Sequence, residues 1–229
     1  PRAQDRQSAE YMDVLRALLD AGAEPNVRLK THLWYWEYGL TKMGIDLTGA
    51  TPFWRATFAQ DLEAMKLLVA HGADPNIPTQ KVARQRRGGG DDLELDPSGL
   101  LPVPNGGPGA YPIHAATGVG YGEGFAGNAH RHAPDAWLAT VQYLIELGAD
   151  VSQRDQNGYN AIHHAAARGH NELILYLVEQ GGDVTAVSRR GQTTADMANG
   201  PVQRVSPIPE TVALLESLGS KNNHNCVSC

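Results

Sequence analysis

The chain has little cysteine, no long apolar run and no excess of positive charge. Both of its two cysteines lie among the last four of 229 residues, which excludes a disulfide-rich scaffold. No run of about 18 apolar residues occurs, so the sequence predicts no membrane insertion. The formal net charge of −6 argues against nucleic acid as the main partner, because phosphate binding needs a basic face.

The sequence also lacks a pattern typical of a catalytic or cofactor site. No Ser/His/Asp or Cys/His arrangement has a spacing that would bring the groups together. The triple glycine Gly88-Gly89-Gly90 is not a phosphate-binding loop, because no strand precedes it and no Lys-Ser/Thr follows. We therefore expect a protein that is not an enzyme and holds no cofactor in its main body.

The most informative stretch runs from Gly158 to Gly191, which lie 33 residues apart. It contains Ala161-Ile162-His163, the small pair Ala165-Ala166 and then Gly169, which suits the left-handed end of a first helix. An apolar stripe at 3–4 spacing follows on a second helix. A helix pair of this size cannot bury its stripe alone, so it must stack on neighbours.

The end of the second helix recurs four more times. The recurring glycines are Gly22, Gly72, Gly148, Gly181 and Gly219. Four residues before each stands a leucine: Leu18, Leu68, Leu144, Leu177 and Leu215. Seven residues before each stands another apolar residue: Leu15, Met65, Val141, Ile174 and Val212. This double pattern predicts five equivalent sites in successive layers.

These residues resemble the ankyrin repeat, whose period is about 33 residues and whose unit is a turn plus two antiparallel helices. The resemblance implies an all-α solenoid of stacked helix pairs with long loop insertions. We expect one domain over 1–229, with repeats near 11–26, 49–76, 109–151, 158–184 and 191–219 and a tail at 220–229. The resemblance implies that His114 and His163 each make a structural hydrogen bond between adjacent loops. At the equivalent position of the second repeat stands Trp54, which must pack differently.

The first copy has only its second helix. We expect either that the chain is the C-terminal part of a longer array or that residues 1–10 form a short atypical cap. The chain as a whole resembles the C-terminal part of a group of bacterial ankyrin proteins that have such insertions and a Cys-X-X-Cys ending. Members of this group often carry an export signal. That similarity favours a periplasmic or extracellular location, with a cytoplasmic location as the alternative.

Three insertions interrupt the repeats. The first carries Trp34, Tyr35, Trp36 and Tyr38, which predict either a small core folded on the neighbouring repeat or a partner-binding patch. The second, 77–108, contains a short basic run followed by carboxylates and reads as a flexible tethering loop. Both lie between repeats.

The third insertion, 119–134, lies within a repeat. It contains Tyr121, Phe125, His130 and Arg131, which predict either an ordered loop or a partner-binding loop. A metal pocket with His130, His132 and Asp135 is a further alternative, although a metal there needs a third ligand held close by.

The tail ends in His224-Asn225-Cys226-Val227-Ser228-Cys229. It predicts a terminal disulfide or a disordered end, a metal site of His224, Cys226 and Cys229, or a partner-linkage or redox role. The leading hypothesis is a scaffold that binds a folded protein through its concave face and inserted loops. The alternative is an exported metal- or redox-linked accessory protein that uses the Cys-X-X-Cys.

Overall fold

The computed structural model describes residues 9–32, 46–83, 96–121, 123, 136–203 and 205–229. Within these ranges the chain forms helices and no strand, which confirms the predicted all-α class. No helix of the described part is long and apolar enough to cross a membrane. The helices are α1 (Tyr11–Asp20), α2 (Pro52–Ala59), α3 (Leu62–Ala70), α4 (Pro112–Thr117), α5 (Trp137–Glu146), α6 (Ala161–Arg168), α7 (Asn171–Glu179), α8 (Thr194–Ala198) and α9 (Pro209–Ser217).

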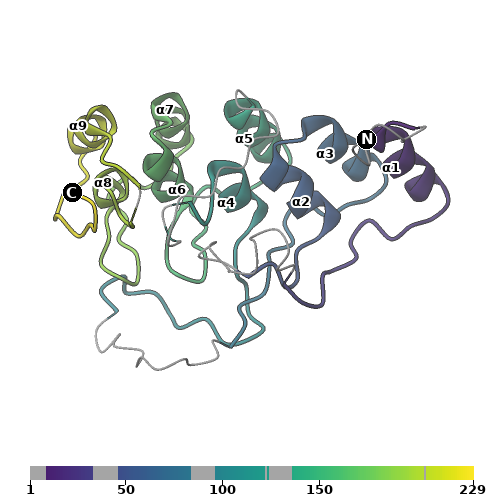
Figure 1. Cartoon of the computed structure of the whole chain (residues 1–229), viewed down its shortest axis with the longest axis horizontal. Helices are drawn as coiled ribbons and strands as arrows, with labels where there is room; N and C mark the ends of the chain where they lie inside the picture. Colours follow the sequence, from purple (N-terminus) through teal and green to yellow (C-terminus); the bar gives the residue numbers. More distant parts are fainter. Residues whose placement is uncertain (1–8, 33–45, 84–95, 122, 124–135, 204) are drawn as a thin grey trace, which may run out of the picture.

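The helices stand in two parallel rows along the long axis of the molecule (Figure 1). We name α2, α4, α6 and α8 the inner row and α1, α3, α5, α7 and α9 the outer row. Each inner helix packs on its own outer partner and on the neighbouring inner helices, of which α2 and α8, at the ends of the described row, have one each. The molecule is therefore a solenoid, with the two chain ends at opposite ends of the stack. The described parts of the connections between repeats lie on the side of the inner row (Figure 1).

Local signals explain where the helix pairs begin and turn. The side chain of Asn160 accepts a hydrogen bond from the His163 amide at 3.1 Å and so caps the start of α6. Gly169 ends α6 in the left-handed region at φ +73°, and α7 starts two residues later. In the second pair Thr51 caps α2, and Gln60 takes the left-handed position without being glycine.

The recurring leucines occupy equivalent buried sites in the outer row. Leu68, Leu144, Leu177 and Leu215 are each at most 1% exposed. Leu18, predicted to be equivalent to them, is instead 55% exposed, while Leu19 beside it is buried. Helix α1 stands at the N-terminal end of the outer row. The face bearing Leu18 therefore has no neighbouring helix among the described residues.

Three of the four inner helices are buried almost throughout, and α2 has both buried and partly buried residues. Every residue of α4 and of α8 is buried, and so are residues 161–167 of α6. Outer helices can cover only one side of an inner helix. The loops on the other side must therefore take part in the core.

Candidate functional site

Inserted and terminal segments cover the inner row. Leu29 and Leu47, on either side of the first insertion, pack in a second apolar cluster with Trp54, Phe58 and Val119. At the other end of the stack, Val227 and Ser228 of the tail donate backbone hydrogen bonds to the carbonyl of Gly200, just after α8. These segments therefore cover part of the inner row, and the predicted binding of a partner through the concave face and the inserted loops stays a prediction.

One position per repeat ties each inner helix to the next loop along the stack. It is the third residue after the helix cap, occupied by Trp54, His114, His163 and Asp196. His114 and His163 each donate from Nε2 to a carbonyl of the following loop, at 3.1 Å to Gln153 and 3.2 Å to Gln192. The predicted structural role of both histidines is thus confirmed.

Other side chains make the same tie in the first and last of these repeats. The indole N–H of Trp54 donates to the carbonyl of Ala110 at 2.9 Å, so Trp54 replaces a histidine without losing its bond. Asp196 instead accepts from the amides of Asn223 and Asn225 in the tail, at 2.8 and 3.3 Å. The tail therefore takes the place that the next loop holds elsewhere in the stack.

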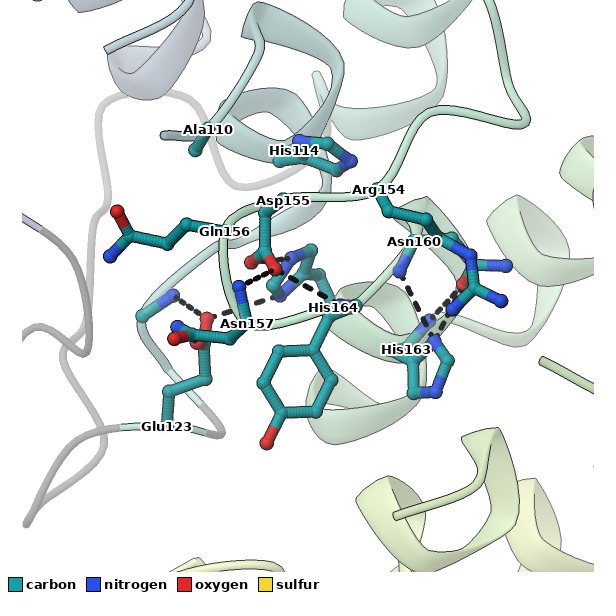
Figure 2. Close-up of polar contacts among 12 residues, drawn as sticks. Ala110, His114, Glu123, Arg154, Asp155, Gln156, Asn157, Asn160, His163 and His164 are labelled. Carbon is teal, nitrogen blue, oxygen red and sulfur yellow. Dashed lines mark hydrogen bonds and ion pairs between the residues drawn. The ribbon is translucent and has the colours of Figure 1, made fainter. Parts of the chain in front are cut away.

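A buried polar cluster lies between the α4–α5 and α6–α7 pairs (Figure 2). Asp155 stands in the loop before α6, His164 is on α6, and Glu123 comes from the third insertion. His164 Nε2 lies 3.3 Å from Asp155 Oδ2, and His164 Nδ1 lies 3.6 Å from Glu123 Oε1. The three side chains are at most 2% exposed, so the cluster is closed to bulk water.

Neighbouring groups hold the two carboxylates in place. Asp155 Oδ1 accepts from the amides of Asn157 and Tyr159 at 2.8 and 3.0 Å. The Asn157 side chain donates to Glu123 Oε2 at 2.6 Å, and the Gly120 amide donates to Glu123 Oε1 at 3.2 Å. In contrast, Asp155 Oδ2 and both ring nitrogens of His164 have no hydrogen bond.

Burial controls the protonation of this cluster. It raises the pKa of Asp155 to about 6 and also raises the pKa of Glu123, where the nearby Asp155 charge adds to the effect. It lowers the pKa of His164 and of the adjacent His114 to about 4. Two carboxyls and an imidazole with opposed pKa shifts can hold a proton or a cation.

Most of the predicted partner-binding residues lie outside the described part of the chain. These are Trp34, Tyr35, Trp36, Tyr38, Phe125, His130 and Arg131, together with the alternative metal ligands His132 and Asp135. Tyr121 is described: its ring stacks 4.4 Å below the Arg168 guanidinium, which also lies 4.7 Å from the Trp137 ring. Tyr121 is therefore part of the packing between repeats.

The two ends of the second insertion make defined contacts. We predicted a tethering loop, yet residues 96–108, named the strap here, run along the loops of several repeats (Figure 1). Arg189, in the loop before α8, holds the strap by an ion pair with Asp96 and by hydrogen bonds to the carbonyls of Leu100 and Leu101 at 3.2 and 2.6 Å. Arg189 also donates to the Gln156 carbonyl at 3.1 Å.

The tail cysteines Cys226 and Cys229 form a disulfide with each other. In this oxidised form neither sulfur is a thiolate, so the metal alternative with His224 concerns the reduced chain and stays a prediction. The side chain of Asn199 lies 3.8 Å from the Cys226 sulfur, which places the bridge against the end of α8.

Sequence reasoning missed Glu123, Asp155, His164 and Arg189. His164 looked like an ordinary repeat position, and Glu123 stood in an insertion of unknown course. A partial signal existed for Asp155, because an Asp three residues before Gly158 is suited to accept from the amides of the turn.

Comparison with known proteins supports the repeat assignment. The family described as "Ankyrin repeats (many copies)" matches residues 144–198, and the family "Ankyrin repeat" matches residues 48–80. Ankyrin repeat and SAM domain-containing protein 6 of Rattus norvegicus is 35% identical over 82 residues, which are 35% of this chain and 9% of that protein. Protein phosphatase 1 regulatory subunit 27 of Mus musculus is 33% identical over 60 residues, 26% of this chain and 39% of that protein.

A third relative, the Notch-regulated ankyrin repeat-containing protein of Xenopus tropicalis, is 37% identical over 49 residues, 21% of this chain and 43% of that protein. The chain thus matches less than half of the length of each of these relatives. With the stacked helix pairs, these matches define the class as helical repeat proteins. The chain contains ankyrin repeats, matched at residues 48–80 and 144–198.

Proposed function

We propose that the protein is a non-enzymatic scaffold that binds a folded protein partner through its inserted segments and loop tips. Ankyrin repeats support a protein-interaction role, and one relative is named a regulatory subunit of protein phosphatase 1. Because the inner helices are enclosed, the proposed contact surface on the concave side is made by the segments that lie over them. The negative net charge favours a protein partner over nucleic acid.

The observation that carries the proposal is Leu101 on the strap. Its side chain is 87% exposed, although Arg189 binds the carbonyls of Leu100 and Leu101. A large apolar side chain on a pinned backbone loses little conformational freedom on binding, which suits an interface anchor. We further propose that Trp34, Tyr35, Trp36 and Tyr38 add aromatic contacts, because such residues dominate interface hot spots.

The test is photo-crosslinking and quantitative capture in cells of the source organism. A photoreactive residue at position 101 should crosslink one recurring protein, and Leu101→Asp should lower its capture at least about tenfold, as expected for a buried anchor. Leu175→Asp, at a leucine 48% exposed on the outer helix α7, is the matched control and should bind normally. Equal capture by both variants, or no recurring crosslink, would overturn the proposal.

The aromatic cluster is tested separately. Trp34→Ala combined with Trp36→Ala should lower capture while the melting temperature stays within about 4 °C, the shift that a change of 1 kcal/mol produces in a domain of this size. Unfolding of the double variant would assign both rings to the core and would remove them from the proposed surface.

The tail disulfide favours a second candidate, a redox-linked accessory role of Cys226 and Cys229. Thiol titration of the purified protein across a series of thiol–disulfide buffers checks it. Reversible reduction near the redox poise of the compartment supports this role, whereas a disulfide that resists all buffers short of strong reductant removes it.

A further inference from the structure

We propose that Glu123, Asp155 and His164 bind a divalent transition metal ion, with Zn²⁺ as the best match, at the junction of the α4–α5 and α6–α7 pairs. The site would join the third insertion to two successive repeats. It is separate from the tail cysteines and does not depend on the proposed partner-binding role.

The geometry fits one shared ion. One ligand atom from each of the three residues can be chosen so that all lie within 4.8 Å of one another. Ligands about 2.0–2.2 Å from a tetrahedral zinc ion lie roughly 3.3–3.6 Å apart. The separations of 3.3 Å (Asp155 Oδ2 to His164 Nε2) and 3.6 Å (Glu123 Oε1 to His164 Nδ1) involve the two different ring nitrogens, so a shared ion would use only one of these nitrogens. From spacings of up to 4.8 Å the three ligand atoms must therefore draw closer when the ion binds.

The candidate ligand atoms of Asp155 and His164 have no hydrogen bond, whereas Glu123 Oε1 accepts from the Gly120 amide. Asp155 Oδ2 and the two His164 nitrogens are unpaired, and their side chains have no exposed surface. Leaving buried polar atoms unpaired costs free energy, so such atoms indicate a missing partner. The other carboxylate oxygen of each acid is held by Asn157, in the way that outer partners orient metal ligands.

Charge and ligand type narrow the identity of the ion. When both carboxyls are ionised beside a neutral imidazole, the cluster carries a charge of −2, which a divalent cation would balance in a site closed to water. The nearest basic side chain of the loop, Arg154, is directed to the carbonyls of Gly158 and Val187. A mixed set of imidazole and carboxylate ligands favours zinc over magnesium or calcium.

The experiment is a zinc titration of the full chain after chelator treatment, in a Cys226→Ser, Cys229→Ser background that removes the tail thiols. Calorimetry should give one Zn²⁺ per chain, and the melting temperature should rise with zinc concentration. Co²⁺ in place of zinc should give visible absorption bands. Glu123→Gln and His164→Gln should each weaken binding at least about tenfold, since even outer partners of a ligand have that effect.

The matched control is His71→Gln, which removes another histidine that contacts a carboxylate, Asp20 at 3.0 Å, but at the surface. This variant should bind zinc as the parent does. Absence of saturable zinc binding, or an equal loss of zinc affinity in His71→Gln and Glu123→Gln, would overturn the proposed site. The charge of the cluster would then be balanced by protons alone. If His164→Gln fails to fold by circular dichroism, Glu123→Gln, whose residue lies outside the helices, decides the question.

Discussion

At the scale of single residues, one position in each repeat carries the link to the next. Trp54, His114, His163 and Asp196 occupy the same place after the helix cap and reach the following segment with different chemistry. Indole and imidazole donate to a carbonyl, whereas the carboxylate accepts from amides. The carboxylate of Asp196 suits the tail because the backbone N–H groups of Asn223 and Asn225 face it.

We expect Trp54→Phe to lower the free energy of unfolding by about 1–3 kcal/mol. The change removes a buried hydrogen bond worth about 1 kcal/mol and leaves a cavity next to Phe58, whose ring stacks 5.2 Å away. Urea denaturation measures the effect. Trp137→Phe is the control, because the described contacts of Trp137 are ring contacts with His170 and Arg168. A loss no larger than in this control would refute the role of the indole N–H.

His170 should make the protein sensitive to acid. Burial, and then the Arg168 charge, lower the pKa of His170 to about 4, below the value of 6.5 for the free side chain. Between pH 6.5 and 4 the unfolded chain therefore binds a proton that the folded chain resists, and stability falls as the pH falls. His170→Gln should flatten the curve of unfolding free energy against pH in this window.

His71→Gln serves as the comparison for His170. A backbone hydrogen bond to Leu67 and the Asp20 side chain raise the pKa of His71, so its contribution is full at low pH and is lost as the pH rises through the raised pKa. Its removal should not flatten the acid limb. Parallel curves for the parent and His170→Gln would contradict the assignment.

At the scale of elements, the insertions and the tail complete the core. Helices α4, α6 and α8 are too short to be stable alone and are enclosed by segments that the repeat pattern does not contain. The strap is the clearest case, because Arg189 joins it to the loops at 156 and 189, far along the stack.

Arg189→Ala should release the strap without unfolding the stack. It removes the ion pair with Asp96 and the bonds to two strap carbonyls, so amides in 96–108 should exchange with solvent at least about tenfold faster. Hydrogen exchange with mass spectrometry gives the rates for strap and helices separately. Arg190→Ala, at an exposed neighbour, should leave the strap unchanged. Similar exchange in both variants would show that Arg189 does not hold the strap.

At the scale of the whole molecule, the sequence predicted the stacked helix pairs well, but it did not predict how the insertions and the tail pack on them. The spacing of leucines before each glycine is a local property of one helix and its turn, so it identified four of the five outer sites correctly. The prediction that Leu18 is buried was wrong, because the exposure of this residue depends on which elements lie beside α1. The contact of Glu123 with His164 depends on the path of a long loop, which periodicity does not constrain.

The enclosure of the inner row is the claim on which the rest depends. Cysteines introduced by Ala115→Cys on α4 and Ala167→Cys on α6, at positions 1% exposed, measure it through their rates of labelling by a thiol reagent. We expect both to react at least about a hundredfold more slowly than Ser217→Cys, at an exposed position on α9, and to match it in urea. Labelling in the folded protein within a few-fold of the Ser217→Cys rate would show that the inner face is open and would contradict the account.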